Sequence, residues 1–130
     1  MKWEVVLRLI MAMVAGGFIG LERQKSNRPA GFRTHTLVCV GSALVFLTSQ
    51  FIFDNYHHLV NLDPTRLPAQ VISGIGFLGA GTIIHYGPNV RGLTSAATLW
   101  VVACIGLAIG AGFYWGAIAT AITVYITLIL

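Results

Sequence analysis

The residues best suited to chemistry in this sequence are one carboxylate, three guanidiniums, one amide and two hydroxyls, and they fall in two short polar segments between long apolar ones. They are Glu22, Arg23, Arg33, Thr34, Asn89, Arg91 and Thr94. Guanidinium groups bind carboxylates and phosphates through paired hydrogen bonds. We therefore expect the two segments to form one contact site, for an anion or for a partner protein.

The apolar segment that follows each polar one strengthens this expectation. If helices begin at about Thr34 and Leu93, their first turns present unpaired N–H groups and partial positive charge, which favour a bound anion. The threonines of the two segments can cap these helices. Glu22 is the nearby carboxylate and is expected to pair with Arg33 or Arg91. The alternative is that the arginines only fix the orientation of the chain and contact lipid phosphates.

Composition places these segments in a membrane protein. Charged residues make up 9% of the chain and hydrophobic residues 56%, and the mean hydropathy is +0.80, whereas an average soluble domain is about 25% charged. No Lys, Arg, Asp or Glu occurs from Gly92 to Leu130. The net charge of +4 is therefore interpreted as a signal of how the chain is oriented in the membrane, and no nucleic-acid partner is expected.

Five apolar segments have the length of about 20 residues that crosses a bilayer as a helix. The predicted spans of this all-α bundle are residues 3–21, 34–53, 67–85, 93–112 and 114–130, within one transmembrane domain over residues 1–130. Lys and Arg are concentrated in the first and third connections, which predicts the N-terminus outside and the C-terminus inside. The last span ends without a polar anchor, so we expect a cytoplasmic continuation.

A proline, an arginine and a threonine recur in the same order in the first and third connections. These are Pro29, Arg33 and Thr34, then Pro88, Arg91 and Thr94. The recurrence is compatible with a repeat of two helical hairpins, and equally with coincidence.

Small residues four apart indicate close packing between helices in lipid. The glycines concerned are Gly16, Gly20, Gly74, Gly76, Gly79, Gly81, Gly106 and Gly110. Because the third segment carries two such faces, we expect it in the middle of the bundle with neighbours on both sides. Its Gly-x-Gly-x-x-Gly pattern lacks the strand–helix–strand context of a dinucleotide site. We also expect a homo-oligomer, most simply a dimer.

The remaining polar groups point to no enzyme, cofactor or resident metal. Cys39 and Cys104 stand alone on different predicted helices and are expected to be packing residues. Thr98 is expected to bond back to its own helix or across to a neighbour. His85 is expected at the cytoplasmic end of the third span. The second connection holds candidates for a weak divalent-cation or pH-responsive site, although a solvated loop is the better interpretation. Those candidates are Asp54, His57, His58 and Asp63.

Direct conduction of Mg²⁺ is the less favoured alternative, because no carboxylate lies in the centre of a predicted span and Mg²⁺ is usually held through carboxylates and retained waters. Arg8 is the one charge well inside a span, and it can pair with Glu4 four residues before it.

Four motifs carry a resemblance to a known family. They are GFIGLERQ at residues 17–24, PAGFRTH at 29–35, SGIGFLGAG at 73–81 and NVRGLTSAATLW at 89–100. Together they resemble the membrane domain of the bacterial MgtC/SapB family over essentially the whole chain.

The resemblance implies a multi-pass inner-membrane protein with five membrane helices, often followed by a soluble cytoplasmic domain that is absent here. It implies a role in adaptation to low magnesium and in survival inside host cells. The protein would fill this role by regulating another membrane complex, without catalytic turnover of a substrate. The F-type ATP synthase has been proposed as that complex. The asparagine of the NVRG turn, Asn89 here, is implicated in the action. Transport of Mg²⁺ or another ion remains the alternative.

Overall fold

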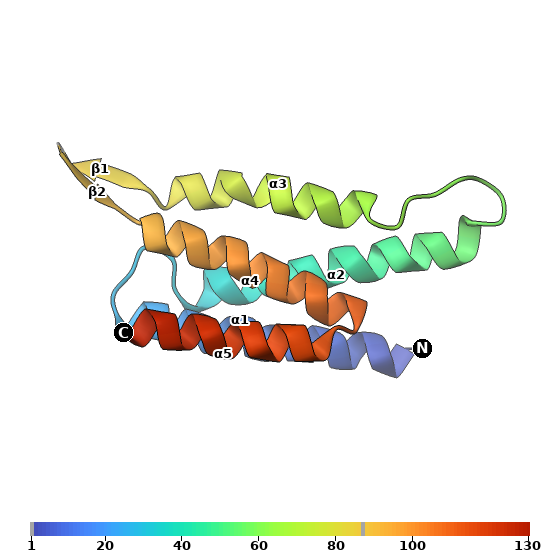
Figure 1. The fold of residues 1–130 in the computed structure, drawn as a ribbon, viewed down its shortest axis with the longest axis horizontal. Coiled ribbons are helices and arrows are strands. Elements are labelled where there is room, and N and C mark those ends of the chain that lie inside the picture. Colours follow the sequence, from blue (N-terminus) through green and yellow to red (C-terminus); the bar gives the residue numbers. More distant parts are fainter. Residues whose placement is uncertain (1, 87) are drawn as a thin grey trace.

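The computed structural model describes residues 2–86 and 88–130, which form five helices and one two-stranded antiparallel β-hairpin (Figure 1). In chain order the elements are α1 (Lys2–Lys25), α2 (Phe32–Tyr56), α3 (Arg66–Gly81), β1 (Ile84–Tyr86), β2 (Asn89–Arg91), α4 (Leu93–Ala111) and α5 (Tyr114–Ile129). The helices run in alternating directions. The α1–α2 connection, the β-hairpin and the C-terminus therefore lie at one end, called the hairpin end below, and the N-terminus and the 57–65 connection lie at the other (Figure 1).

The central helix of the bundle is α4, which packs against α1, α2, α3 and α5. Its apolar residues surround the whole helix, as expected for a helix that neighbours enclose, and Leu99, Val102 and Ala103 are fully buried. In contrast, α3 lies at the edge of the bundle and contacts only α4 and α2 extensively (Figure 1). Its Phe77 side chain is 84% exposed. The expectation that this segment lies in the middle of the bundle is therefore wrong.

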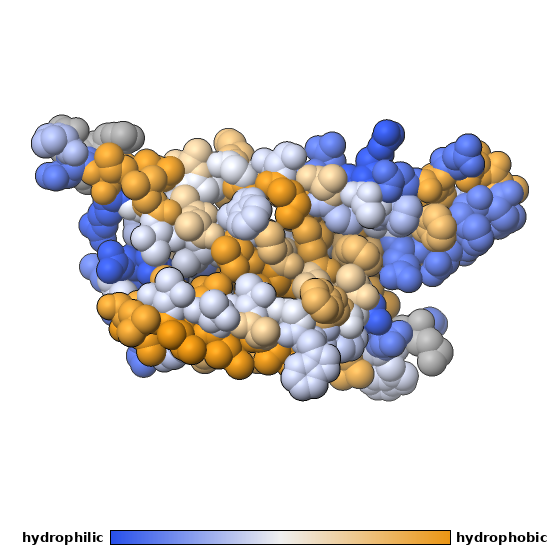
Figure 2. Space-filling view, in the orientation of Figure 1, coloured by the Kyte–Doolittle hydropathy of each residue, from blue (hydrophilic) through white to orange (hydrophobic). Residues whose placement is uncertain are grey.

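Three helices, α1, α2 and α4, are long and apolar enough to cross a membrane. The other two, α3 and α5, have 16 residues each, so at 1.5 Å per residue each is about 24 Å long, less than the hydrocarbon core of about 30 Å. Hydrophilic residues gather at the two ends of the molecule and leave an apolar middle (Figure 2). The chain is a membrane protein with five helices, whereas five full spans, the orientation and the repeat stay predictions.

Glycines allow α2 to approach both α1 and α4 closely. They are Gly16 and Gly20 of α1 and Gly106 and Gly110 of α4. A Cβ atom added at Gly16 would lie 2.7 Å from the Cβ of Cys39. One added at Gly106 would lie 2.8 Å from the Cβ of Ser42. Both distances are below van der Waals contact, so the helices can pack this closely only because the side chains are absent.

The glycines of α3 differ from these. At Gly74, Gly76 and Gly81 an added Cβ would meet nothing within 4 Å. Only Gly79 faces a neighbour, because a Cβ there would lie 3.5 Å from that of Ala96 on α4. Within the described residues, the close packing expected at the other three positions does not occur.

The β-hairpin was not predicted, and it replaces the end of the expected third span. The helix ends at Gly81, so His85 lies in β1 instead of at a helix terminus. The sequence offers a local cause: Ile83 and Ile84 are β-branched and favour extended backbone, directly after Thr82, which is still in the helical region. After β2 the chain enters α4 through Gly92, whose φ is 99° and whose added Cβ would overlap the carbonyl oxygen of Thr82.

At the N-terminal end, Arg8 caps the last turn of α4. Its Nη1 donates to the carbonyl oxygen of Gly110 at 2.7 Å, and its Nε donates to the Tyr114 hydroxyl at 2.9 Å. Its Nη2 also lies 3.5 Å from a carboxylate oxygen of Glu4, which confirms the expected pairing. A cation is favourable where helix carbonyls have no partners.

The 57–65 connection, also at the N-terminal end, was the expected place of a weak divalent-cation or pH-responsive site. The structure does not bring those candidate residues together as metal ligands. Asp63 accepts hydrogen bonds from the hydroxyl and the N–H of Thr65, and these bonds hold the pKa of Asp63 below its usual range. His57 stacks on Phe53 and its Nδ1 lies 2.7 Å from the carbonyl oxygen of that residue. Across residues 2–86 and 88–130, no three His, Cys, Asp or Glu side chains are grouped as metal ligands would be.

Candidate functional site at the hairpin end

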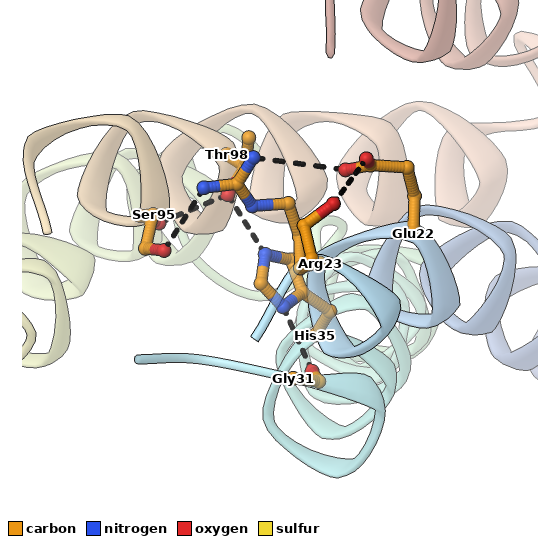
Figure 3. Close-up of polar contacts among 7 residues, drawn as sticks. Glu22, Arg23, Gly31, His35, Ser95 and Thr98 are labelled. Carbon is orange, nitrogen blue, oxygen red and sulfur yellow. Dashed lines mark hydrogen bonds and ion pairs between the residues drawn. The ribbon is translucent and has the colours of Figure 1, made fainter. Parts of the chain in front are cut away.

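A group of polar side chains lies inside the bundle where α1 ends and where α2 and α4 begin (Figure 3). This polar cluster consists of Glu22, Arg23, His35, Ser95 and Thr98. Four of its members are at least 95% buried. Charged and polar groups removed from water need partners, so the contacts of each member decide what the cluster can do.

Arg23 is the charged centre of the cluster and only 3% exposed. Its Nη2 donates to the Ser95 hydroxyl at 3.2 Å, and its Nη1 lies 3.6 Å from a carboxylate oxygen of Glu22 (Figure 3). The other Glu22 oxygen accepts a hydrogen bond from Ser26 at 2.8 Å. The Nε of Arg23 and the Oε1 of Glu22 are buried without a hydrogen-bond partner among the described residues. The guanidinium is thus only partly satisfied by its own chain.

His35 is fully buried and joins α2 to α4. Its Nδ1 donates to the carbonyl oxygen of Gly31 at 2.9 Å, and its Nε2 lies 2.8 Å from the Thr98 hydroxyl (Figure 3). That hydroxyl also lies 3.0 Å from the carbonyl oxygen of Ser95. In a neutral imidazole with the proton on Nδ1, Nε2 can only accept, so Thr98 has one proton for two acceptors. An imidazolium would satisfy every contact. The cluster contains no activated nucleophile, and its chemistry is that of hydrogen bonding and charge.

The structure separates the expected contact residues into a buried and an exposed set. Glu22 pairs with Arg23 and not with Arg33 or Arg91, because its side chain is held beside the last turn of α1. Arg91 is exposed, and its Nη2 donates to the carbonyl oxygen of Asn27 at 2.9 Å, which ties β2 to the α1–α2 connection. Arg33 is exposed on the first turn of α2. Sequence spacing did not show that Arg23 faces inward.

The expected threonine caps are wrong. The N-cap residues of α2 and α4 are Gly31 and Gly92, and neither Thr34 nor Thr94 occupies that position. The N-cap of α2 lies three residues before Thr34, and the N-cap of α4 lies two residues before Thr94. At α2 the N–H of Phe32 instead donates to the side-chain oxygen of Gln24 at 3.2 Å. At α4 no side chain of the N-cap residue makes a capping bond.

Asn89 and Val90 lie on β2, which extends beyond the helix ends together with β1 (Figure 1). Both residues are exposed, Val90 to 42%. The strand pairs Tyr86 with Asn89 and Ile84 with Arg91. The polar cluster therefore lies beneath a small exposed surface whose backbone is fixed by strand pairing.

Two members of the polar cluster, His35 and Ser95, were not predicted from the sequence. A signal existed for His35 and Ser95, because a polar residue inside an apolar segment commonly faces the bundle interior. Thr98 was expected to bond back to its own helix or across to a neighbour, and it does both.

A bundle with three membrane-length helices around a buried, partly charged cluster defines a polytopic membrane protein. Comparison with known sequences then assigns the family: the profile of the MgtC family matches residues 9–130, and the chain belongs to that family. The expected resemblance is confirmed. No solved structure matches the chain.

Relatives in three bacteria illustrate the relationship. The chain is 48% identical over 116 residues to the "Putative magnesium transporter YhiD" of Escherichia coli K12, covering 88% of the chain and 54% of YhiD. It is 45% identical over 124 residues to protein MgtC of Salmonella typhimurium 14028s, covering 95% of the chain and 51% of MgtC. It is 41% identical over 128 residues to protein SapB of Bacillus subtilis, covering 95% of the chain and 55% of SapB. The chain spans about half the length of these relatives.

Proposed function

We propose that the chain is the membrane part of a regulatory protein of the bacterial inner membrane, which acts by contacting another membrane complex at its hairpin end. The F-type ATP synthase is the partner that the family resemblance implies. In this proposal the regulator serves adaptation to low magnesium or to conditions inside host cells. It forms contacts and catalyses no reaction.

The observation that carries the proposal is the exposed β-hairpin above a fixed polar cluster. Asn89 and Val90 are exposed, while Arg91 anchors the strand to Asn27 and the Thr82 hydroxyl lies 3.3 Å from the Gly92 carbonyl oxygen. An exposed segment whose backbone is already ordered loses little entropy on binding. The amide of Asn89 offers both donors and an acceptor to a partner.

Ion transport is the competing proposal, and the name of the Escherichia coli relative supports it for that protein. The geometry of the polar cluster favours ion transport less than regulation by contact. Glu22, the carboxylate inside the polar cluster, already faces the positive charge of Arg23, and a cation entering there would meet that guanidinium. Mg²⁺ is usually bound through one or two carboxylates and retained waters, and a fixed positive charge next to the carboxylate opposes its binding.

Photocrosslinking in membranes tests the proposed contact. A crosslinking residue is placed at Asn89 and, as a matched control, at Asn61, an exposed asparagine in the connection at the opposite end. We expect a defined adduct with a subunit of the F-type ATP synthase from position 89 and none from position 61. Adducts with lipid alone at position 89, or the same protein adducts from both positions, would contradict the proposal.

A functional measurement separates regulation from transport. Inverted membrane vesicles that contain the chain are assayed for ATP-driven proton pumping, and proteoliposomes of the purified chain are assayed for Mg²⁺ uptake. We expect Asn89→Ala to abolish the effect on pumping at unchanged membrane abundance, whereas Asn61→Ala preserves it. Mg²⁺ uptake by the purified chain that Glu22→Gln abolishes would establish the transport alternative instead.

A further inference from the structure

A small pocket opens at the hairpin end, between the α1–α2 connection, β2 and the first turn of α4. Its volume is about 290 Å³. The lining residues that matter are Arg23, Arg28, Arg91, Gly92, Thr94 and Ser95. Three guanidiniums from three separate segments therefore meet around one cavity. The sequence predicted Arg23 and Arg91 in one contact site, and the structure adds Arg28.

The charge of this pocket is unbalanced. None of the residues that line it is acidic, and the nearest carboxylate, on Glu22, already lies beside Nη1 of Arg23. Like charges around a small volume repel one another, and the repulsion grows as water is excluded. Arg91 is nevertheless held in place by its bond to the Asn27 carbonyl oxygen. Such an arrangement favours a bound anion.

The backbone adds to this preference. The first N–H groups of an α-helix lack partners within the helix and carry partial positive charge. In α4 the N-cap residue is Gly92, which has no side chain to satisfy them, and Thr94 and Ser95 line the pocket.

A second observation, independent of the helix terminus, points to a ligand here. Arg23 lines the pocket although it is only 3% exposed, and its Nε has no hydrogen-bond partner among residues 2–86 and 88–130. A buried guanidinium left partly unsatisfied is costly, because its N–H group has lost water and gained no other acceptor. An anion in the adjoining pocket would offset its charge.

We propose that this pocket binds a phosphate-bearing anion, with Arg28 and Arg91 as direct ligands, Arg23 as the buried charge behind them, and N–H groups of the first turn of α4 completing the site. Arginine forms paired bonds to phosphate oxygens. The volume is at the lower limit of small-molecule sites, roughly 300 Å³, and suits a phosphate group with a small substituent. The phosphate belongs either to the headgroup of an anionic lipid or to a soluble compound. The inference does not rest on the proposed regulatory function.

Two arms of one binding experiment distinguish these sources. The full chain is reconstituted in nanodiscs of phosphatidylcholine only, and its melting temperature is followed as inorganic phosphate replaces chloride at constant ionic strength. In the second arm phosphate is omitted and phosphatidylglycerol replaces part of the phosphatidylcholine. A rise in melting temperature in the first arm supports a soluble ligand, and a rise only in the second supports a lipid headgroup.

Matched variants assign the effect to the pocket. Arg28→Gln and Arg91→Gln change exposed arginines that line it, whereas Arg33→Gln changes an exposed arginine that does not. We expect each pocket variant to weaken the apparent affinity at least tenfold and Arg33→Gln to leave the affinity unchanged. Arg28→Gln should also keep the melting temperature of the ligand-free protein, whereas Arg91→Gln removes the bond to Asn27 as well. No rise in either arm, or an equal loss with Arg33→Gln, would overturn the proposal.

Discussion

At the scale of single residues, Thr98 links the two parts of the polar cluster, His35 on one side and Ser95 with Arg23 on the other. Its hydroxyl lies 2.8 Å from Nε2 of His35 and 3.0 Å from the carbonyl oxygen of Ser95, and Ser95 in turn accepts a bond from Arg23. A hydroxyl in this position cannot be exchanged for a methyl group without leaving a buried nitrogen unpaired. The cluster is therefore expected to be sensitive to very small changes.

We predict that Thr98→Val destabilises the protein by about 1–3 kcal/mol, the usual cost of an unsatisfied buried polar group, although the side-chain volume hardly changes. Thr123→Val is the matched control, because Thr123 is exposed and its hydroxyl bonds only to Ala119 of its own helix. Thermal unfolding in detergent micelles measures both. Equal melting temperatures for the two variants would show that the His35 contact contributes no stability.

The ion pair of Glu22 with Arg23 supports a second prediction at this scale. Glu22→Gln leaves the buried guanidinium without a negative partner, and we expect a loss on the order of 3 kcal/mol, as found when one member of a buried pair is removed. Glu4→Gln removes the partner of Arg8 at a carboxylate that is 59% exposed, and solvent screening limits that loss to less than about 1 kcal/mol. Chemical denaturation of both variants in the same detergent compares them. A smaller loss for Glu22→Gln than for Glu4→Gln would contradict the assignment.

At the scale of elements, the approach of α4 to α2 depends on absent side chains. We predict that Gly106→Ala destabilises the bundle by about 1–3 kcal/mol, because the new methyl group must displace Ser42 and the backbone of Cys39. Gly41→Ala is the control, since a Cβ at this exposed α2 position would meet nothing within 4 Å. Thermal unfolding again provides the measurement. A Gly106→Ala variant as stable as Gly41→Ala would contradict this prediction, because it would mean that α4 can move slightly away from α2 without lowering the free energy of unfolding.

The elements also show what the sequence can and cannot predict. Five apolar segments yielded five helices, because segment length and hydropathy are local properties. The β-hairpin was missed because a short strand pair has a weaker signal than the apolar segment it interrupts, and residues 82–84 were absorbed into a helix. The partners of Arg23 and His35 were missed because Ser95 and Thr98 lie 72 and 63 residues away, and only the packing of α4 against α1 and α2 brings them together.

At the scale of the whole molecule, one surface that lacks a neighbour in the described chain is on α3. This helix lies at the edge of the bundle (Figure 1), and its Gly74, Gly76 and Gly81 face no other part of the described chain. Small residues on a lipid-facing helix permit close contact with a second helix. The homodimer expected from the sequence therefore has a defined candidate interface, formed by α3 of each protomer.

We predict that the chain is a dimer in nanodiscs and that Gly76→Leu converts it to a monomer while the melting temperature of the protomer is retained, because a Cβ added at this position meets no atom of its own chain within 4 Å. Gly41→Leu, which adds the same side chain at an equally open position on α2, is expected to stay dimeric. Native mass spectrometry measures the mass of each. A dimer that persists in Gly76→Leu but dissociates in Gly41→Leu would place the interface on α2, and a monomeric unmodified chain would contradict dimerisation altogether.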